Sequence, residues 1–142
     1  VFYFSANKGA EPIEIGKVVS GGELSRIMLS IKYLIASKIN LPSILFDEID
    51  SGVSGEIAHK MGELMHFMSQ QDIQVISITH LPQVAVLGKS HLLVSKQDSN
   101  GFTETLIQSL KKEERVQEIA KMLSGKEITP ITISNARELL GS

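Results

Sequence analysis

Apolar residues recur at helical spacing along a stretch that follows a glycine pair near the amino terminus. Six of them share one face of a helix with 3.6 residues per turn: Leu24, Ile27, Met28, Ile31, Leu34 and Ile35. Ser20 precedes this stretch as a candidate N-cap, and Glu23 completes a Ser-x-x-Glu capping box. The pattern predicts an amphipathic helix whose apolar face is turned to the core. It runs to about Ile39, where Asn40 and Pro42 end it.

Short apolar runs alternate with helical stripes in the next segment. Residues 43–46 are apolar without alternation, which predicts a strand buried on both faces of a parallel sheet. A helical stripe follows the turn at 51–55, with apolar residues at Ile57, Met61, Leu64, Met65 and Met68. Residues 75–79 predict a second buried strand. This order predicts an α/β fold, with a mainly parallel sheet flanked by helices.

The two ends of the chain carry shorter patterns. They predict a strand at 1–4, a loop at 5–17, a short helix at 83–87, strands at 91–96 and 103–110, a helix at 112–124, and a last helix. Asn100-Gly101 between the two later strands predicts a β-hairpin. Gly125 is placed to end one helix, and Thr129-Pro130 to begin the last. We expect one domain over residues 1–142.

Composition narrows the class of protein. A hydrophobic content of 42%, a charged content of 21% and a net charge of −2 are typical of an ordinary globular domain without a whole-domain basic field. A local basic patch formed by the fold remains compatible with these values. The absence of cysteine excludes disulfides and fits a reducing, cytoplasmic compartment. No apolar run is long enough to span a membrane. The chain begins with Val1, so we expect a piece of a longer protein.

The loop before the first helix has two interpretations. Gly21 and Gly22 leave backbone N–H groups open at a helix N-terminus, where the helix dipole favours phosphate. The Ser20 hydroxyl can donate a hydrogen bond as well. Alternatively, Ser20 and Glu23 only cap the helix while the glycines turn the chain. The motif alone favours capping.

Polar side chains follow both predicted strands. Asp47 and Glu48 come directly after the first strand, and His80 follows the second. Because ligands bind beyond the carboxyl ends of parallel strands, we expect these side chains to cluster at one edge. Each feature alone is more often a solvated turn or a surface histidine. Together with the Ser20 loop, in this order, they favour a functional site.

With these residues in place, the chain resembles the second lobe of an ABC-type ATPase head. Ser20-Gly21-Gly22-Glu23 matches the family signature, residues 44–47 match the Walker B strand, and His80 matches the switch histidine. The resemblance implies that Asp47 holds Mg²⁺ through water and that Glu48 activates the attacking water. It also implies that His80 hydrogen-bonds the γ-phosphate of ATP.

Two further stretches refine this resemblance. The D-loop region corresponds to Asp50, Ser51, Gly52, Val53 and Ser54, where related heads commonly carry Asp at the position of Ser54. Within the superfamily the chain resembles the RecN family of SMC-like bacterial DNA-repair ATPases, in segments 4–7, 20–26, 46–50, 52–55, 79–85 and 119–125. The resemblance implies a role in DNA double-strand break repair and recombination, DNA contact through the full-length protein, and a cytoplasmic, nucleoid-associated location.

One half of a nucleotide site is missing from the sequence. There is no Gly-x-x-x-x-Gly-Lys-[Ser/Thr] loop in residues 1–142. The resemblance implies that this Walker A loop belongs to an N-terminal lobe of the same protein, and that the Ser20 loop faces ATP held by a second head in a homodimer. We therefore expect a C-terminal lobe that alone neither hydrolyses ATP nor binds it tightly.

Two other classes of function are open. Asp47, Glu48, Asp50 and His80 could form a metal-dependent phosphohydrolase or nuclease site that needs no ATP. Alternatively, the chain could be a non-catalytic dimerisation module whose signature loop only completes a partner's site. The adjacent Asp47 and Glu48 carboxylates, placed after an apolar strand, favour the ATPase head over both.

Overall fold

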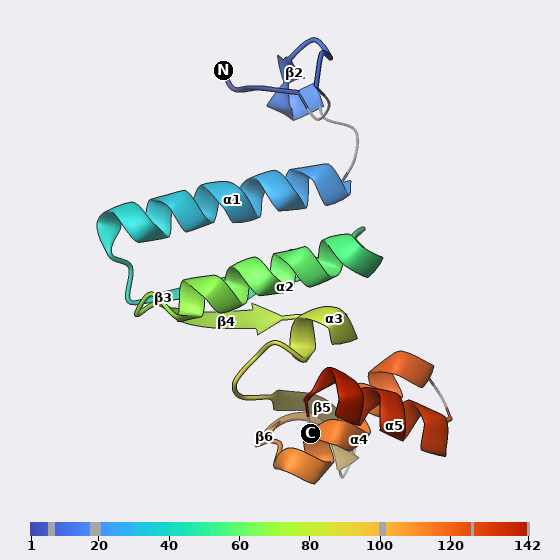
Figure 1. Ribbon diagram of the computed structural model, residues 1–142. Coiled ribbons are helices and arrows are strands. Elements are labelled where there is room, and N and C mark those ends of the chain that lie inside the picture. Colours follow the sequence, from blue (N-terminus) through green and yellow to red (C-terminus); the bar gives the residue numbers. More distant parts are fainter. Residues whose placement is uncertain (6–7, 18–20, 100–101, 126, 142) are drawn as a thin grey trace. The chain divides into compact units, whose positions relative to one another are not determined.

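The computed structural model describes residues 1–5, 8–17, 21–99, 102–125 and 127–141. It divides into two units, residues 1–81 and 82–142, each with its own core (Figure 1). Three predicted features lie outside the described residues. These are Ser20, the capping box that Ser20 would form with Glu23, and the Asn100-Gly101 turn.

The first unit contains the predicted order of helix, strand, helix and strand. Its elements are α1 (Gly21–Ile39), β3 (Ser43–Asp47), α2 (Gly55–Ser69) and β4 (Gln74–Ile78). Strands β3 and β4 pair in parallel over five positions, from Ser43 opposite Gln74 to Asp47 opposite Ile78. The α/β fold and the parallel pairing are therefore confirmed. Helices α1 and α2 lie on the same side of the two strands (Figure 1).

The strands are buried on one face, and the prediction of burial on both faces is wrong for this unit. Phe46 is fully buried beneath the helices, with the Lys32 ammonium of α1 lying 5.4 Å from its ring centroid. Side chains alternate across a strand, so the neighbouring positions point to the opposite face. There Leu45 is 54% exposed and Ile78 49% exposed. No described element of this unit covers that face.

Helix α1 packs with a different side from the one its apolar pattern predicts. Its buried residues are Gly22, Leu29 and Ala36, whereas Leu24, Met28, Leu34 and Ile35 are all exposed. Small side chains allow close approach to α2, where Tyr33 and Phe67 meet edge to face with ring centroids 6.1 Å apart. The stripe of larger apolar residues lies on the other side of the helix. The sequence shows that α1 is apolar, but not which side packs within this unit.

The amino-terminal segment forms more structure than the predicted strand and loop. Strands β1 (Tyr3–Phe4) and β2 (Ile13–Glu14) pair antiparallel, and a 3₁₀ turn, η1, covers Ile15–Lys17. The amide of Ile15 donates to the carbonyl of Phe2 over 2.9 Å and extends the pairing.

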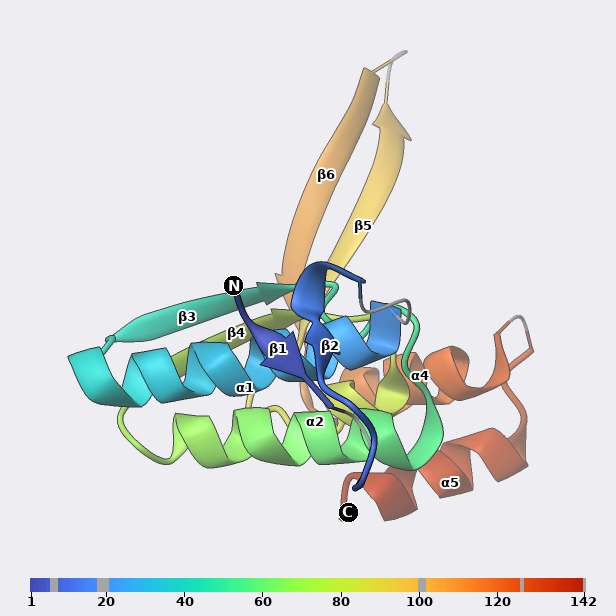
Figure 2. The same cartoon turned by 90° about the horizontal axis from the view of Figure 1, so that it is seen from above.

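The second unit holds a hairpin and three helices. The helices are α3 (Pro82–Ala85), α4 (Lys112–Ser124) and α5 (Pro130–Leu139). Strands β5 (Leu92–Ser99) and β6 (Phe102–Ser109) form the predicted antiparallel hairpin, seen as two long paired arrows in Figure 2. Its core consists of Val116, Ile119, Ala120 and Ala136.

The predicted helix ends of this unit are present. Gly125 ends α4 with a positive φ of 75°. Thr129 caps α5 by accepting a hydrogen bond from the Thr132 amide over 3.2 Å.

Candidate functional site at the carboxyl edge of β3 and β4

The parallel register brings the predicted catalytic residues to one edge. Asp47 lies opposite Ile78, so Glu48 directly follows one strand while Thr79 and His80 directly follow the other. The Glu48 amide donates to the Ile78 carbonyl over 3.1 Å and continues the pairing beyond the strands. The side chains of Asp47, Glu48 and His80 are all exposed. The register therefore brings the ends of the two strands, and with them these three residues, to one edge of the sheet.

Glu48 has an unusual backbone conformation. Its φ is 44°, in the left-handed region that few residues other than glycine occupy. Holding such a conformation costs on the order of 1 kcal/mol, and such residues are concentrated at functional sites. The turn that follows is closed by the Ser51 amide, which donates to the Glu48 carbonyl over 3.0 Å. The chain therefore bends sharply where the exposed carboxylate is presented.

Asp50 lies inside the unit rather than at its surface. Its side chain is 1% exposed, and one carboxylate oxygen accepts a hydrogen bond from the Thr79 hydroxyl. The same hydroxyl accepts a hydrogen bond from the Leu81 amide over 3.0 Å. The second carboxylate oxygen, Oδ1, has no partner among the described residues. Asp50 thus connects the turn after β3 to the segment after β4.

The first turn of α1 lies against the same turn. A Cβ atom added to Gly22 would be 2.8 Å from the Gly52 carbonyl oxygen and 3.5 Å from a Val53 methyl group. Position 22 therefore favours glycine, whereas no atom of the described residues lies within 4 Å of a Cβ at Gly21. The glycine pair thus brings the start of α1 into contact with the D-loop region, although the two are distant in sequence.

The remaining predicted site residues occupy mixed environments. Glu23 is half-buried, Val53 is buried, and Ser51 and Ser54 are exposed. Ser54 occupies the N-cap position of α2 in extended backbone, without a side-chain capping bond. Its hydroxyl has no hydrogen-bond partner among the described residues and can therefore bind another group.

The described residues contain no preformed multidentate metal site. No group of three or more His, Asp or Glu side chains in those ranges lies close enough to hold a metal ion. Asp47 can offer one exposed carboxylate, which suits Mg²⁺, because this ion is bound by few protein carboxylates together with phosphate oxygens and water.

None of the helices in the described ranges is long and apolar enough to cross a membrane.

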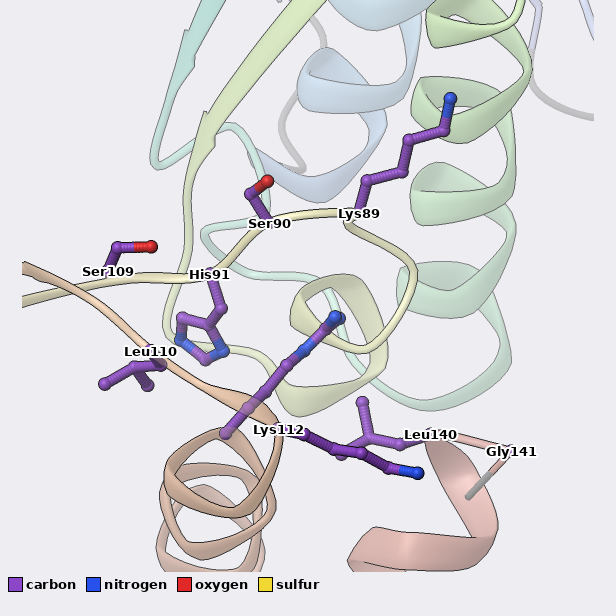
Figure 3. A pocket seen from close by; sticks show the side chains of 9 residues that line it. Lys89, Ser90, His91, Ser109, Leu110, Lys112, Leu140 and Gly141 are labelled. Atoms are coloured by element: carbon purple, nitrogen blue, oxygen red, sulfur yellow. The ribbon is translucent and has the colours of Figure 1, made fainter.

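A second polar region, in the unit of residues 82–142, was missed by sequence reasoning. A cavity of about 450 Å³ is lined by Lys89, Ser90, His91, Ser109, Leu110, Lys112, Arg115, Leu140 and Gly141. Figure 3 shows the His91 imidazole on the same side as Lys112 and Leu140, while the Lys89 side chain extends the other way. The His91 side chain is half-buried.

Arg115 explains the environment of His91. Its guanidinium donates to the carbonyls of Ala85, Val86 and Gly88 over 2.6–3.1 Å, and so holds the end of α3. Burial lowers the pKa of His91, the nearby Arg115 charge lowers it further, and Glu118 acts in the opposite direction. A histidine at the start of a strand gives no sequence signal for such burial.

Relatives of this chain are DNA repair proteins. No family model matches it. The DNA repair protein RecN of Bacillus subtilis (strain 168) is 45% identical over 139 residues, which cover 98% of this chain and 24% of that protein. RecN of Vibrio cholerae serotype O1 is also 45% identical over 139 residues, covering 98% of this chain and 25% of the relative. The chain therefore spans about a quarter of the length of these curated relatives.

Solved structures with the same fold are SMC ATPase heads. One was described in work on the ATP-driven dimerisation and DNA-stimulated activation of SMC ATPases. Its TM-score is 0.62 at 22% sequence identity, and the match covers 84% of this chain and 70% of that one. An SMC head bound to the C-terminal winged-helix domain of ScpA has a TM-score of 0.58 at 25% identity, over 70% of this chain and 30% of that one. The chain has the α/β fold of an SMC-type ATPase head lobe, and over 98% of its length it is homologous to part of RecN.

Proposed function

We propose that this chain is the C-terminal lobe of an ATP-hydrolysing head that acts in DNA double-strand break repair and recombination. The observation that carries the proposal is the β3–β4 register, which brings Asp47, Glu48 and His80 to one sheet edge. The relatives named as DNA repair proteins and the SMC-head fold support it. The ATPase activity is proposed for the whole protein, because this lobe contains only part of a nucleotide site.

Three exposed side chains have different roles in the proposed ATP hydrolysis. The Asp47 carboxylate is the group that would hold Mg²⁺, which when bound neutralises charge on the phosphates. Glu48 orients the attacking water and accepts its proton at a carboxylate oxygen, since it lies one residue beyond the strand end. His80 donates a hydrogen bond toward the γ-phosphate, where negative charge must be stabilised.

The signature residues act across a dimer in this proposal. Ser20, Gly21, Gly22 and Glu23 would face ATP held by a second head, because the chain has no phosphate-cradling lysine loop of its own. Gly21 is exposed at the first position of α1, where free amide groups favour phosphate. The D-loop residues Ser51 and Ser54 are also exposed and would contribute to the same interface.

A further partner in this proposal is the N-terminal lobe of the same protein. The uncovered face of the β3–β4 pair carries Leu45, Ile76 and Ile78, which are 45–54% exposed. An apolar sheet face is stable when another layer covers it. A lobe carrying the Walker A loop would supply both this cover and the missing phosphate contacts. DNA would bind through the full-length protein.

The test uses the full-length protein with Glu48→Gln. This change keeps the shape and hydrogen bonding of the side chain but removes the proton acceptor, so ATP turnover should fall about 10²–10⁴-fold. ATP binding should persist, and the protein should accumulate as an ATP-bound dimer. Rapid-quench hydrolysis and light scattering measure the two effects. Turnover within a few-fold of the parent would remove Glu48 from the mechanism.

An assay of phosphodiester cleavage without ATP, run beside the same experiment, separates the other classes of function. Phosphodiester cleavage without ATP would favour a metal-dependent phosphohydrolase that uses Asp47, Glu48 and His80. ATP-dependent association with unchanged turnover in the Glu48→Gln variant would instead favour a dimerisation module.

A further inference from the structure

Asp50 is the one charged side chain among the described residues that is fully buried. Burying a carboxylate is unfavourable unless hydrogen bonds replace its water. Thr79 supplies such a bond from 29 residues away in the sequence.

The Thr79 hydroxyl makes two hydrogen bonds, one of which closes a turn around His80. It donates to the Asp50 carboxylate and accepts from the Leu81 amide over 3.0 Å, so the donor residue Leu81 and the acceptor residue Thr79 flank His80 on either side. Hydroxyl bonds of this kind to the backbone two residues on form compact ST-turns. With its proton directed to Asp50, the hydroxyl presents a lone pair to the Leu81 amide. The carboxylate therefore fixes the turn whose middle residue is His80.

The backbone of Asp50 belongs to the turn that presents Glu48. The Asp50 carbonyl accepts from the Val53 amide over 3.1 Å, and the Ser51 amide closes the preceding turn on Glu48. A movement of Asp50 would therefore disturb both segments. One buried side chain joins the segment that carries Glu48 to the segment that carries His80.

We infer that Asp50 and Thr79 are positioning residues, and that their hydrogen bond sets His80 relative to Glu48 at the sheet edge. This inference rests on the proposed function of His80. It assigns Asp50 a role inside its own lobe, since a side chain that is 1% exposed is not available to ATP held by another head.

The experiment uses Thr79→Val in the full-length protein, because valine keeps the shape of threonine and removes the hydroxyl. Thr79→Ser retains the hydroxyl and should behave as the parent. Thr103→Val is the matched control, since the Thr103 hydroxyl also donates to an aspartate, Asp98, over 2.7 Å, but on the exposed hairpin. If Thr79→Val is not recovered folded, Asp50→Asn weakens the same bond at nearly constant shape and replaces it.

Two readouts are expected to move together. Hydrogen exchange in the nucleotide-free protein should show a faster Leu81 amide in Thr79→Val, and no change there in Thr79→Ser or Thr103→Val. Turnover at a temperature well below unfolding should fall about 10–10²-fold, in the range that a small misplacement of a reacting group produces. KM for ATP should change less than about threefold, because ground-state binding does not use this bond.

Combination with His80→Ala decides the route of the effect. If Thr79 acts through His80, Thr79→Val should add little to the loss already caused by His80→Ala. Three outcomes would overturn the inference and leave the proposed function standing. The first is that the losses of turnover in Thr79→Val and His80→Ala are additive, and the second is that Thr79→Val and Thr79→Ser lose turnover equally. The third is that Thr79→Val has normal turnover while His80→Ala is slow. Parent-like turnover of His80→Ala would overturn the proposed role of His80, and the inference with it.

Discussion

Asp47 and Glu48 are adjacent exposed carboxylates whose backbone conformations differ. Asp47 is the last residue of β3 and keeps strand pairing with Ile78, whereas Glu48 has a φ of 44° and begins the turn. Their side chains are therefore carried by two different backbone conformations. This separation allows one carboxylate to serve a metal while the other serves water.

Asp47→Asn tests this separation. In the full-length protein it should weaken Mg²⁺-dependent ATP binding by about 10–100-fold, the range that loss of a group supporting a metal produces. Glu48→Gln should leave that binding intact. Titration with ATP at several Mg²⁺ concentrations measures the difference. Equal binding losses in the two variants would show that the carboxylates do not divide the roles.

His91 contributes a pH dependence of stability in the second unit. Burial lowers its folded-state pKa below the unfolded value of about 6.5, so the unfolded chain binds more protons in that range. The stabilising contribution is present above that unfolded pKa and is lost as the pH falls through the folded one. His91→Gln should therefore flatten the fall in melting temperature below about pH 6.5.

Melting curves between neutral and mildly acidic pH measure this effect. Ser109→Ala, a change in the same cavity without a titrating group, controls for lost packing. Parallel curves for His91→Gln and the parent would exclude His91 as the source.

At the scale of elements, the start of α1 depends on its contact with the D-loop region. Glycine to alanine inside a helix normally stabilises it by about 0.5–1 kcal/mol. At position 22 a methyl group would meet the Gly52 carbonyl oxygen at 2.8 Å, and neither backbone is free to move far. The close packing of the two turns should therefore reverse the usual gain.

Gly22→Ala should lower the stability of the isolated chain by about 1–3 kcal/mol, as overpacking does. Gly21→Ala, where nothing lies within 4 Å of the added methyl, should leave stability unchanged or slightly raised. Urea unfolding followed by circular dichroism compares the two. Equal stability of the two variants would mean that α1 and the D-loop turn do not pack this closely in solution.

At the scale of the whole molecule, the chain exposes surfaces that a complete head would cover. The outer face of β3–β4 and one side of α1 hold large apolar residues without a partner in their unit. The relatives are about four times longer, so the covering layer belongs in our proposal to the rest of the protein. The same chain would then have different burial when isolated and when complete.

Leu45→Glu makes this difference measurable. Leu45 is 54% exposed, so the isolated chain should lose no more than about 0.5 kcal/mol, as at most surface positions. In the full-length protein the same carboxylate would be buried without a partner, and this burial should lower the free energy of unfolding by about 2 kcal/mol or more. Thermal unfolding of both proteins provides the comparison. A small effect in both would show that this face stays open in the complete head.

Local sequence patterns determined most of the elements and indicated which residues are candidates for the site. The apolar run before Asp47 predicted a strand, the stripe of Met61, Met65 and Met68 predicted the buried face of a helix, and Thr129-Pro130 predicted the start of α5, and the structure contains all three. These features depend on backbone propensity, capping and side-chain periodicity within a few residues. The polar residues after each strand could likewise be identified from their place in the order of elements.

Tertiary structure decided what neighbours in space impose. The packed side of α1, the open face of Leu45, the contact between Gly22 and Gly52, and the burial of Asp50 and His91 all depend on residues distant in sequence. Periodicity shows that a side chain is apolar, but an element with two apolar sides can pack with either, and only the available partner selects one. A carboxylate in a turn is ordinarily solvated, whereas the buried Asp50 accepts a hydrogen bond from Thr79, which lies 29 residues away in the sequence.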